Sequence, residues 1–553
     1  MKGRRMKRPF VVGWALLPLF LAADAPVSAM NRTEGSCDEI SVGAGTVRVD
    51  EPHLKLPEGD HPLDTAFYLK GRRGATLDFK GRKLLFHGKV QPFLLDGCQD
   101  VTIRNVTICH ARSPFSEGRI VELGPRRIKL DVGSEFPYEV RDGELVFRGE
   151  GWTNIMSRGS KFFQVFDGRT GQGKELRIAT YGTNVQNLHG MRMALRPSVE
   201  DGFLVLTRDE AFGFSPNVGV GDRVVMQHET RDVSSFLLVN CRNVTLENVR
   251  IVNGFGMGVL SFHCRDLMLD RVVFAEGPDS PSVAANANDG IHAIATSGSL
   301  VLKGCRIEGT LDDALNVHGV FFTVKSVSGD RLIADTRNFY STTQLFLPGD
   351  RIRVTRGFTL DASAEYEIVS TRPLSPREIE FTLDRPVAAH AKDDAIENLT
   401  AQCALTIRGC RFGKANTHLR FQTRGKIIVE DTETELPFLL TGDMSHWFES
   451  SPCESFTARN VRFTTPRAIV VANPEFIPTE TSPHYHGDLA FENCSFVADR
   501  PFRLKFVRSI AVRNCRRVDG GSIRMELTNC GPADAQGCTT VRKAVRKTSM
   551  GTN

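Results

Sequence analysis

The chain repeats a short β-strand unit about once every 22 residues, and this repeat limits its possible folds more than any other feature. The segment FLLDGCQDVTIRNVTI at 93–108 returns as FLLVNCRNVTLENVRI at 236–251, with its apolar residues, cysteine and asparagine in register. The shared core is an alternating strand that ends in Asn, Asp or Gly. It recurs at LMLDR (267–271), LVLKG (300–304), LTIRG (405–409), IIVED (427–431), FTARN (456–460), LAFEN (489–493) and IAVRN (510–514).

Neighbouring units start 21–23 residues apart, for example at 244 and 267, or at 489 and 510. A period of this length, built from short strands and polar turns, is typical of a solenoid. Leucine-rich repeats have a similar period but need a recurring LxxLxL pattern, which the sequence lacks. The pattern therefore predicts an all-β fold, a right-handed parallel β-helix whose coils stack at about 4.8 Å.

Two stretches, residues 113–226 and 321–400, interrupt the repeat with alternating strands and tight turns. They share a phrase, VGDRVVM at 220–226 and PGDRIRV at 348–354, so we predict two related β-barrel-like modules inserted into the solenoid. The predicted organisation is a signal peptide (1–29), N-terminal coils (30–112), module 1 (113–226), central coils (227–320), module 2 (321–400), C-terminal coils (401–540) and a basic flexible tail (541–553).

The cysteines follow the repeat. Cys98, Cys241 and Cys264 each lie three residues before a strand unit, whereas Cys305, Cys410, Cys494 and Cys515 each lie five residues after the start of one. Equivalent positions stack in a solenoid, so ladders of buried thiols are expected inside the helix. Disulfides between stacked neighbours are the alternative, although the total of 13 cysteines is odd.

The N-terminus has the pattern of a secretory signal, with a basic start, an apolar run from Phe10 to Ala23 and small residues up to Ala29. We therefore expect a secreted or periplasmic protein with no membrane span after cleavage; a retained anchor is the alternative. Residues 1–29 carry five basic residues and Asp24, so the net charge of +5 falls to +1 after cleavage. A nearly neutral chain gives no reason to expect a nucleic-acid partner.

Three carboxylates gather in the central coils. Asp289 lies 23 residues, or one coil, before Asp312, and Asp313 follows directly. We expect Asp289 and Asp312 on adjacent coils about 5 Å apart, where at least one carboxyl should have a raised pKa. A protonated and an ionised carboxyl are the pair that glycoside hydrolysis needs. The structural alternative is that turn aspartates bind backbone N–H groups or Ca²⁺.

Further polar residues accompany these acids. His292, Asn316 and His318 stand beside them, and Trp447 with Glu449 offers an aromatic face and a carboxylate for a sugar ring. Arg231 precedes a strand unit and is a candidate clamp for a substrate oxygen. Each has an ordinary alternative: a structural histidine, a Trp packed under a loop, or a solvated arginine.

In this order, GMGVL (256–260), Asp289 with His292, LDDALNVHG (311–319), TRGKIIVED (423–431) and HWFES (446–450) resemble glycoside hydrolase family 110, the bacterial exo-α-1,3-galactosidases. The resemblance covers most of the chain and includes the two interruptions. It implies a metal-independent, cofactor-free inverting hydrolase of terminal α-1,3-linked galactose, on linear or blood-group-B-type branched glycans. By position, Asp312 is then the general acid, while Asp289 and Asp313 serve the attacking water.

Two other functions stay open. Polygalacturonases and pectate lyases also use parallel β-helices, and Arg420, Arg424 and Lys426 offer positive charge for a uronate, although all three also fit solvated turn positions. A non-catalytic glycan-binding β-helix would need no clustered acids. Because long solenoids with side modules often assemble, we also expect a homo-oligomer.

Overall fold

A computed structural model gives the fold of most of the chain. It describes residues 39–41, 46–49, 65–155, 162–174, 196–209, 211–212, 214, 216–228, 233–275, 282–336, 345–388, 392–415, 417–445, 447–466 and 468–543. The predicted signal segment, Arg231 and most of the predicted tail lie outside these residues. No helix in the described part of the chain is long and apolar enough to cross a membrane.

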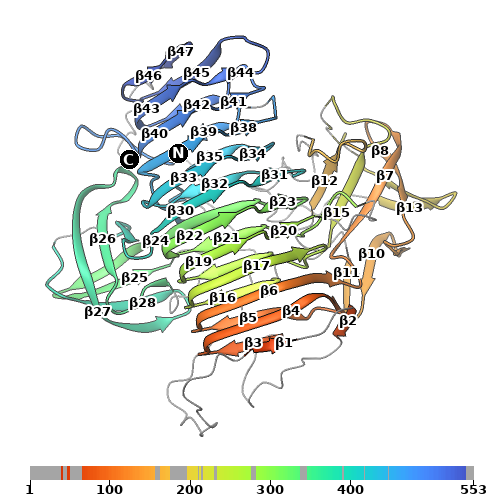
Figure 1. Ribbon diagram of the computed structural model, residues 1–553, viewed down its shortest axis with the longest axis horizontal. Coiled ribbons are helices and arrows are strands. Elements are labelled where there is room, and N and C mark those ends of the chain that lie inside the picture. Colours follow the sequence, from red (N-terminus) through yellow and green to blue (C-terminus); the bar gives the residue numbers. More distant parts are fainter. Residues whose placement is uncertain are drawn as a thin grey trace, which may run out of the picture.

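The predicted parallel β-helix is confirmed, because three rows of strands stack in parallel along the molecule (Figure 1). The first row contains β4 (Arg73–Phe86), β6 (Gln99–His110), β17 (Arg242–Ile251), β19 (Arg265–Asp270), β22 (Ser297–Lys303), β30 (Cys403–Arg408), β33 (Lys426–Glu430), β37 (Ser455–Arg459), β40 (His486–Glu492), β43 (Val507–Arg513) and β46 (Ala533–Ala535). Two short N-terminal strands, β1 (Glu39–Ser41) and β2 (Thr46–Val49), pair with β4.

The second row contains β3 (Thr65–Lys70), β5 (Gln91–Asp96), β16 (Phe236–Val239), β18 (Val259–Phe262), β21 (Ile291–Ile294), β24 (Leu315–Ser328), β32 (Leu419–Gln422), β35 (Phe438–Leu440), β39 (Val470–Ala472), β42 (Phe502–Lys505), β45 (Ile523–Thr528) and β47 (Cys538–Lys543). The third row is made of short strands, β20 (Val273–Phe274), β23 (Arg306–Glu308), β31 (Arg411–Gly413), β34 (Glu433–Thr434), β38 (Arg462–Phe463), β41 (Ser495–Phe496) and β44 (Arg516–Arg517).

Alternation along each strand fills the interior of the helix. In β17, Val244 and Leu246 point inward and are buried, while Thr245 and Glu247 are more exposed. Equivalent inward positions pair from coil to coil and form one apolar column, Val101, Val244, Leu267, Leu300, Leu405, Ile427, Phe456, Leu489 and Ile510. The repeat in the sequence therefore places an apolar residue at the same position of every coil, which gives a continuous core.

The residue that closes each unit has a positive φ, and it is Asn, Asp or Gly in every unit except 267–271, which Arg271 closes. Asn248, Asn460 and Asn493 have φ angles of 50°, 54° and 54°, and Gly304 has 61°. These residue types tolerate positive φ, and a β-branched residue there would be strained.

The cysteines confirm the expectation of buried thiols. The twelve cysteines among the described residues are all unpaired, and nine of them are buried. Stacked neighbours are in contact, since the backbone N–H of Cys241 lies 3.4 Å from Sγ of Cys264, and that of Cys305 lies 3.3 Å from Sγ of Cys410. The thiols therefore fill the interior beside the turns as small apolar groups.

The first insertion is antiparallel. Its six-stranded sheet runs in the order β12 (Phe162–Phe166), β15 (Arg223–Gln227), β7 (Phe115–Leu123), β8 (Arg127–Val132), β14 (Phe203–Thr207) and β13 (Arg196–Glu200), and a smaller sheet contains β11 (Trp152–Ile155), β10 (Glu144–Gly149) and β9 (Tyr138–Arg141). Both sheets are open among the described strands, so the barrel-like closure predicted for residues 113–226 is not found there.

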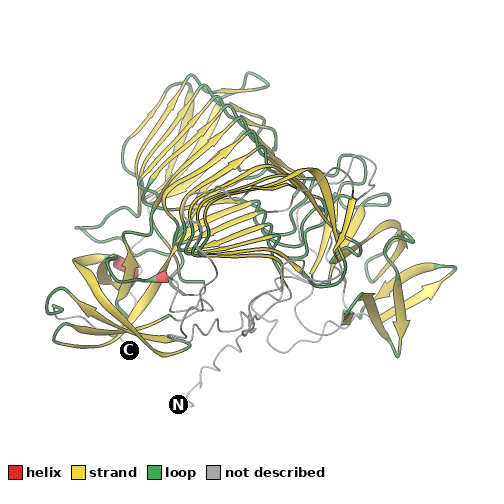
Figure 2. Ribbon diagram, turned by 60° about the horizontal axis from the view of Figure 1, so that its bottom comes forward, coloured by secondary structure: helices red, strands yellow, loops and turns green. Residues whose placement is uncertain are grey.

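The second insertion begins where β24 leaves the coil. Its antiparallel pairings run from β24 through β25 (Arg331–Asp335), β28 (Glu378–Leu383), β27 (Asp361–Ser375), β26 (Arg351–Arg356) and β29 (Ala395–Asn398) back to β24. A one-turn 3₁₀ helix, η1 (Gly357–Thr359), joins β26 to β27. Its apolar core continues into the outward side chains Leu94, Leu237 and Leu260 of the β-helix. Figures 1 and 2 show the two insertions on opposite sides of the stacked coils.

Candidate active site

The aspartate-bearing turns precede two neighbouring strands, β21 and β24, and their register corrects one prediction. Ile291 pairs with Leu315, a step of 24 residues, and Asp289 and Asp313 are separated by the same step. The backbone N–H of Gly290 donates to the carbonyl of Asp313 at 2.9 Å. Asp289 is therefore the coil equivalent of Asp313, not of Asp312, because this coil is one residue longer than the 23-residue spacing assumed.

The position equivalent to Asp312 is Asn288, and the two turns use the same local bond. The N–H of Asp289 donates to Oδ1 of Asn288 at 3.0 Å, and the N–H of Asp313 donates to Oδ1 of Asp312 at 3.1 Å. In both turns, therefore, an Asx side-chain oxygen accepts from the backbone N–H of the residue that follows it. Asp289 and Asp313 are thus held in equivalent, buried positions, while Asp312 is the more exposed of the three acids.

Asn286, which the sequence analysis did not single out, fixes the first turn. Its amide Nδ2 donates to the carbonyls of Gly256, Asn288 and Asp289 at 2.9, 3.0 and 2.8 Å. Asn286 itself is fully buried. A Cβ at Gly254 would lie 1.9 Å from Oδ1 of Asn286, so glycine is required on the neighbouring coil. The GxG-like spacing around 254–258 is the only sequence signal of this arrangement.

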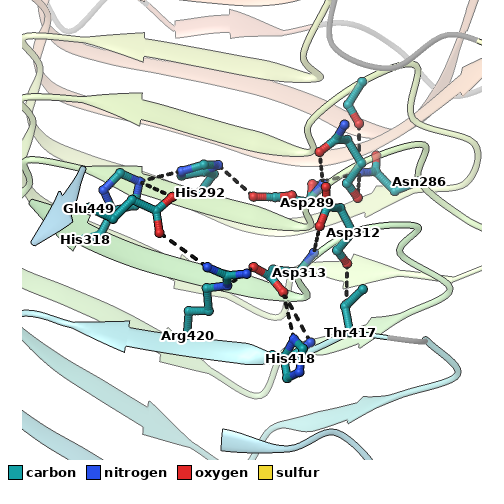
Figure 3. Close-up of polar contacts among 12 residues, drawn as sticks. Asn286, Asp289, His292, Asp312, Asp313, His318, Thr417, His418, Arg420 and Glu449 are labelled. Carbon is teal, nitrogen blue, oxygen red and sulfur yellow. Dashed lines mark hydrogen bonds and ion pairs between the residues drawn. The ribbon is translucent and has the colours of Figure 1, made fainter. Parts of the chain in front are cut away.

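A line of polar side chains leads from Asp289 across the face of the second row of strands (Figure 3). Oδ2 of Asp289 lies 2.7 Å from Nδ1 of His292, and Nε2 of His292 lies 2.8 Å from Nε2 of His318. Nδ1 of His318 lies 2.6 Å from the carbonyl oxygen of Gly319. All three side chains are buried, so each of these contacts needs one group that donates a proton and one that accepts it.

Those contacts fix where the protons are. A carbonyl only accepts, so Nδ1 of His318 carries a proton. Burial lowers the pKa of His318 to about 4, so at neutral pH the ring is neutral and its Nε2 accepts a bond. Nε2 of His292 must then be the donor. The remaining contact of His292 is the one between its Nδ1 and Oδ2 of Asp289.

Arg420 lies beside Asp313. Its Nε is 2.6 Å from Oδ2 of Asp313, and His418 donates its backbone N–H to Oδ1 at 3.3 Å. Burial alone would raise the pKa of Asp313, but the Arg420 guanidinium and His418 outweigh it and hold that pKa below its ordinary value. Asp313 is therefore ionised. Arg420 is not a solvated residue of a turn, which was the alternative reading of its sequence position. Thr417 completes the turn by donating to the carbonyl of Asp312 at 2.7 Å.

Glu449 closes the other side of the site from β36 (Glu449–Ser450), which pairs antiparallel with β24. Its carboxylate accepts from Nε2 of Gln422 at 2.9 Å and lies 3.5 Å from Nη1 of Arg420 and 3.7 Å from Nε2 of His318. Burial would raise the pKa of Glu449, but the adjacent His318 and Arg420 lower it, and the net shift is downward. The predicted carboxylate is thus part of the same site as the aspartates.

Asn316 occupies the centre of this face. It pairs with His292 on one side and with Arg420 on the other, so the three side chains form one outward column. Asn316 is buried, and its side-chain oxygen has no hydrogen-bond partner among the described residues. A buried amide oxygen without a partner is costly, and a ligand hydroxyl would satisfy it.

Two further predicted site residues are Trp447 and Arg231. Trp447 lies two residues before Glu449, is partly exposed, and donates its backbone N–H to Asp443 at 2.9 Å. Its role as a sugar platform stays a prediction. Arg231 lies outside the described residues. Arg420, His418 and Gln422 were missed as site residues because 104 residues separate Leu315 from its partner Leu419, and the repeat is invisible across the second insertion.

Three side chains of the site also have the chemistry of metal ligands. The ligand atoms of His292, His318 and Glu449 all lie within 4.8 Å of one another. The two Nε2 atoms, however, are close enough to share a proton, and neither ring can bind a cation through Nε2 while that bond is made. The arrangement therefore suits a proton network without requiring an ion.

Comparison with known proteins gives relatives over most of the chain. No protein-family model matches it. The chain is 26% identical to Alpha-1,3-galactosidase B of Bacteroides thetaiotaomicron, over 81% of this chain and 74% of that protein. It is 24% identical to Alpha-1,3-galactosidase B of Akkermansia muciniphila (92% and 66%) and 25% identical to Alpha-1,3-galactosidase A of B. thetaiotaomicron (86% and 80%). These relatives support the resemblance to glycoside hydrolase family 110: over most of its length the chain is similar to proteins named α-1,3-galactosidases.

Proposed function

We propose that the protein is a secreted, inverting exo-glycosidase that removes terminal non-reducing α-1,3-linked galactose from linear or blood-group-B-type branched glycans. The observation that carries the proposal is the buried cluster of Asp289, Asp313 and Glu449 around Arg420, in a chain whose relatives are α-1,3-galactosidases. The N-terminal sequence supports secretion.

The environments of Asp289 and Asp313 support a role beside the attacking water. Asp313 is held ionised next to Arg420, and Oδ2 of Asp289 lies 2.7 Å from Nδ1 of His292. We assign Asp312 as the general acid from the family resemblance. In the reaction Asp312 gives its proton to the glycosidic oxygen as the C–O bond breaks. A water adds to C1 from the opposite face, its proton passes to Asp289 or Asp313, and β-galactose is the first product.

The remaining residues bind the sugar in this proposal. Asn316 offers its side-chain oxygen to a sugar hydroxyl, and Glu449 accepts from another. For His292 or His318 to bind the sugar as predicted, a hydroxyl has to replace one of the bonds that their ring nitrogens make within the protein. Trp447 and Arg231 are assigned as further substrate contacts from the sequence. No metal or other cofactor enters the reaction, and a homo-oligomer remains our expectation.

The alternative of a uronate enzyme is less well supported. Two of the basic residues on which it depends are already paired within the protein. Arg420 is bound to Asp313, and Nη2 of Arg424 lies 2.8 Å from Oε2 of Glu397. A uronate carboxylate would have to displace these buried carboxylates.

The test is hydrolysis of a B-type trisaccharide followed by NMR of the first-formed anomer. We expect β-galactose from the wild type and no hydrolysis by Asp312→Asn, which should fold normally because Asp312 is partly exposed. First-formed α-galactose contradicts inversion. Near wild-type rates in Asp312→Asn contradict the assignment of the acid. Polygalacturonate, assayed with and without chelator, covers the alternative function.

A further inference from the structure

One face of the first insertion lies directly against both aspartate-bearing turns. It belongs to the three neighbouring strands β12, β15 and β7, in which alternate residues point the same way. Gln164 pairs with Val225, and Val225 pairs with Glu117, so these residues form one row across the sheet. We define the contact face by the residues that share this side: Phe115, Glu117, Gln164, Phe166, Val225 and Gln227.

The apolar members of the contact face pack on the turns. Phe115, Phe166 and Val225 form a single buried cluster with Val283, Ala284, Ala287 and Leu311. Ala287 lies two residues before Asp289, and Leu311 lies one residue before Asp312. This cluster is separate from the core of the insertion, which is built from the opposite side of the same sheet, for example by Phe163, Val165, Val224 and Met226.

Each polar member of the contact face bonds to the backbone of a turn. Nε2 of Gln227 donates to the carbonyl of Ala287, and Nε2 of Gln164 donates to the carbonyl of Leu311 at 2.5 Å. Both glutamines are buried. A buried amide that donates to a fixed carbonyl holds that carbonyl in one place, since breaking the bond would leave both groups unsatisfied.

Glu117 holds the approach to the first turn. Its carboxylate accepts from the backbone N–H of Val283 at 2.9 Å, from that of Ala284 at 3.0 Å and from the hydroxyl of Ser282. Nη1 of Arg223, on the neighbouring strand β15, lies 3.5 Å from Oε2 of Glu117. A buried carboxylate with several donors costs less than one without them, so this contact is a stable anchor.

We propose that the first insertion positions the catalytic turns, with Gln227 the positioning residue for Asp289 and Gln164 the positioning residue for Asp312. This inference rests on the proposed function. Within the β-helix, Asn286, Thr417 and the strand register fix the turns. The contact face adds bonds to the carbonyls of Ala287 and Leu311 that come from the first insertion. Displacement of a reacting group by about 1 Å can cost roughly 100-fold in rate.

The test compares Gln164→Met and Gln227→Met in the full chain. Methionine keeps the size of the side chain and removes the amide donor. The matched control is Asn398→Leu, which removes a buried amide of the second insertion, one that donates to the carbonyl of Leu345 at 3.0 Å. If a Met variant does not fold, Gln→Asn at the same position keeps the amide but shortens its reach.

Two substrates distinguish the effect of a displaced first turn from that of a displaced second turn. On an α-1,3-galactosyl disaccharide, both Gln variants should lose about 100-fold in kcat with little change in KM, while Asn398→Leu keeps the wild-type kcat. On 4-nitrophenyl α-galactoside, whose leaving group needs little protonation, Gln164→Met should recover most of its rate and Gln227→Met should not. Wild-type kcat in both Gln variants, or an equal loss in Asn398→Leu, would overturn the inference.

Hydrogen exchange gives a readout that does not depend on activity. We expect faster exchange in peptides covering 285–290 for Gln227→Met and covering 310–314 for Gln164→Met, each without change in the other peptide. Unchanged exchange in both peptides overturns the positioning role. Asp312→Asn is measured in parallel: if it is inactive while both Gln variants are fully active, this inference fails and the proposed function stands.

Discussion

Nε2 of His292 and Nε2 of His318 lie 2.8 Å apart in a buried site, a separation that requires one proton between them. Two lone pairs or two N–H groups at this distance would repel. While that proton is shared, neither Nε2 has a lone pair free to bind a metal ion together with Glu449.

Removal of metal should therefore leave activity unchanged. We expect dialysis against a chelator to preserve the rate, and added Zn²⁺ to inhibit by replacing the shared proton, more strongly at higher pH. The measurement is the rate at several Zn²⁺ concentrations at pH 6 and pH 8. Loss of activity on dialysis, restored by one divalent ion, would show that the three residues bind a metal in the working protein.

Replacement of Arg420 by glutamine should move the acidic limb of the pH–rate profile to higher pH. Arg420 keeps the pKa of Asp313 below its ordinary value, and without that charge the effect of burial prevails and the pKa rises. Asp313 would then be protonated at pH values where it is ionised in the wild type. We expect kcat/KM at pH 5, relative to pH 7.5, to fall about tenfold further than in the wild type.

Arg424→Gln is the control for this experiment. Arg424 is also a largely buried arginine in an ion pair, with Glu397 and Glu454, but it does not touch the aspartates. The variant should lose stability while the acidic limb stays in place. An equal shift of the limb in both variants would mean that the effect is general and does not act through Asp313.

Replacement of Asn286 by alanine should lower both stability and activity. The variant loses the two N–H donors that serve the carbonyls of Gly256, Asn288 and Asp289, about 1 kcal/mol for each donor. We expect a loss of about 2 kcal/mol in the free energy of unfolding, measured by denaturant titration, together with a lower kcat, because Asp289 is released.

Asn398→Ala gives the comparison. Asn398 is equally buried and donates to the carbonyl of Leu345 at 3.0 Å and to Asp350 at 2.8 Å, but it lies in the second insertion. Its loss should cost similar stability and leave kcat unchanged. A similar fall of kcat in both variants would show that activity follows global stability alone.

Buried neutral histidines should make the protein less stable in acid. Burial lowers the pKa of His110 to about 4, so between about pH 6.5 and pH 4 the unfolded chain binds a proton that the folded chain does not. Stability is then present above this window and is lost as the pH falls through it, by about 3 kcal/mol for one such group. His110→Gln should flatten the dependence of unfolding free energy on pH, measured by urea titration from pH 4 to pH 8. Parallel curves for variant and wild type would contradict this account.

The sequence was sufficient for the helix because each coil must present inward apolar residues at the same steps, so Val101, Val244 and Leu267 could be aligned without a structure. It was less informative about the site. Counting strand starts paired Asp289 with Asp312, whereas the register of the next strand pairs it with Asp313. A difference of one residue in a turn changes no apolar pattern, so periodicity cannot detect it.

Arg420 shows the second reason why part of the site was missed. In isolation an arginine between turns is most often solvated, and its burial depends on Asp313 and Glu449, which come from different parts of the chain. The contacts of the first insertion with Ala287 and Leu311 were hidden in the same way. These side chains meet only through tertiary packing, which no local pattern records.

Leu315 and Leu419 pair as ordinary neighbours although 104 residues separate them. The coils before and after the second insertion are therefore joined by the same parallel strand pairing as the other coils. Because the second insertion leaves and re-enters the β-helix at adjacent coils, it can be lengthened, shortened or exchanged without moving the acidic residues of the site. This architecture separates the coils that carry the acidic cluster from a part of the chain whose length the stack does not constrain.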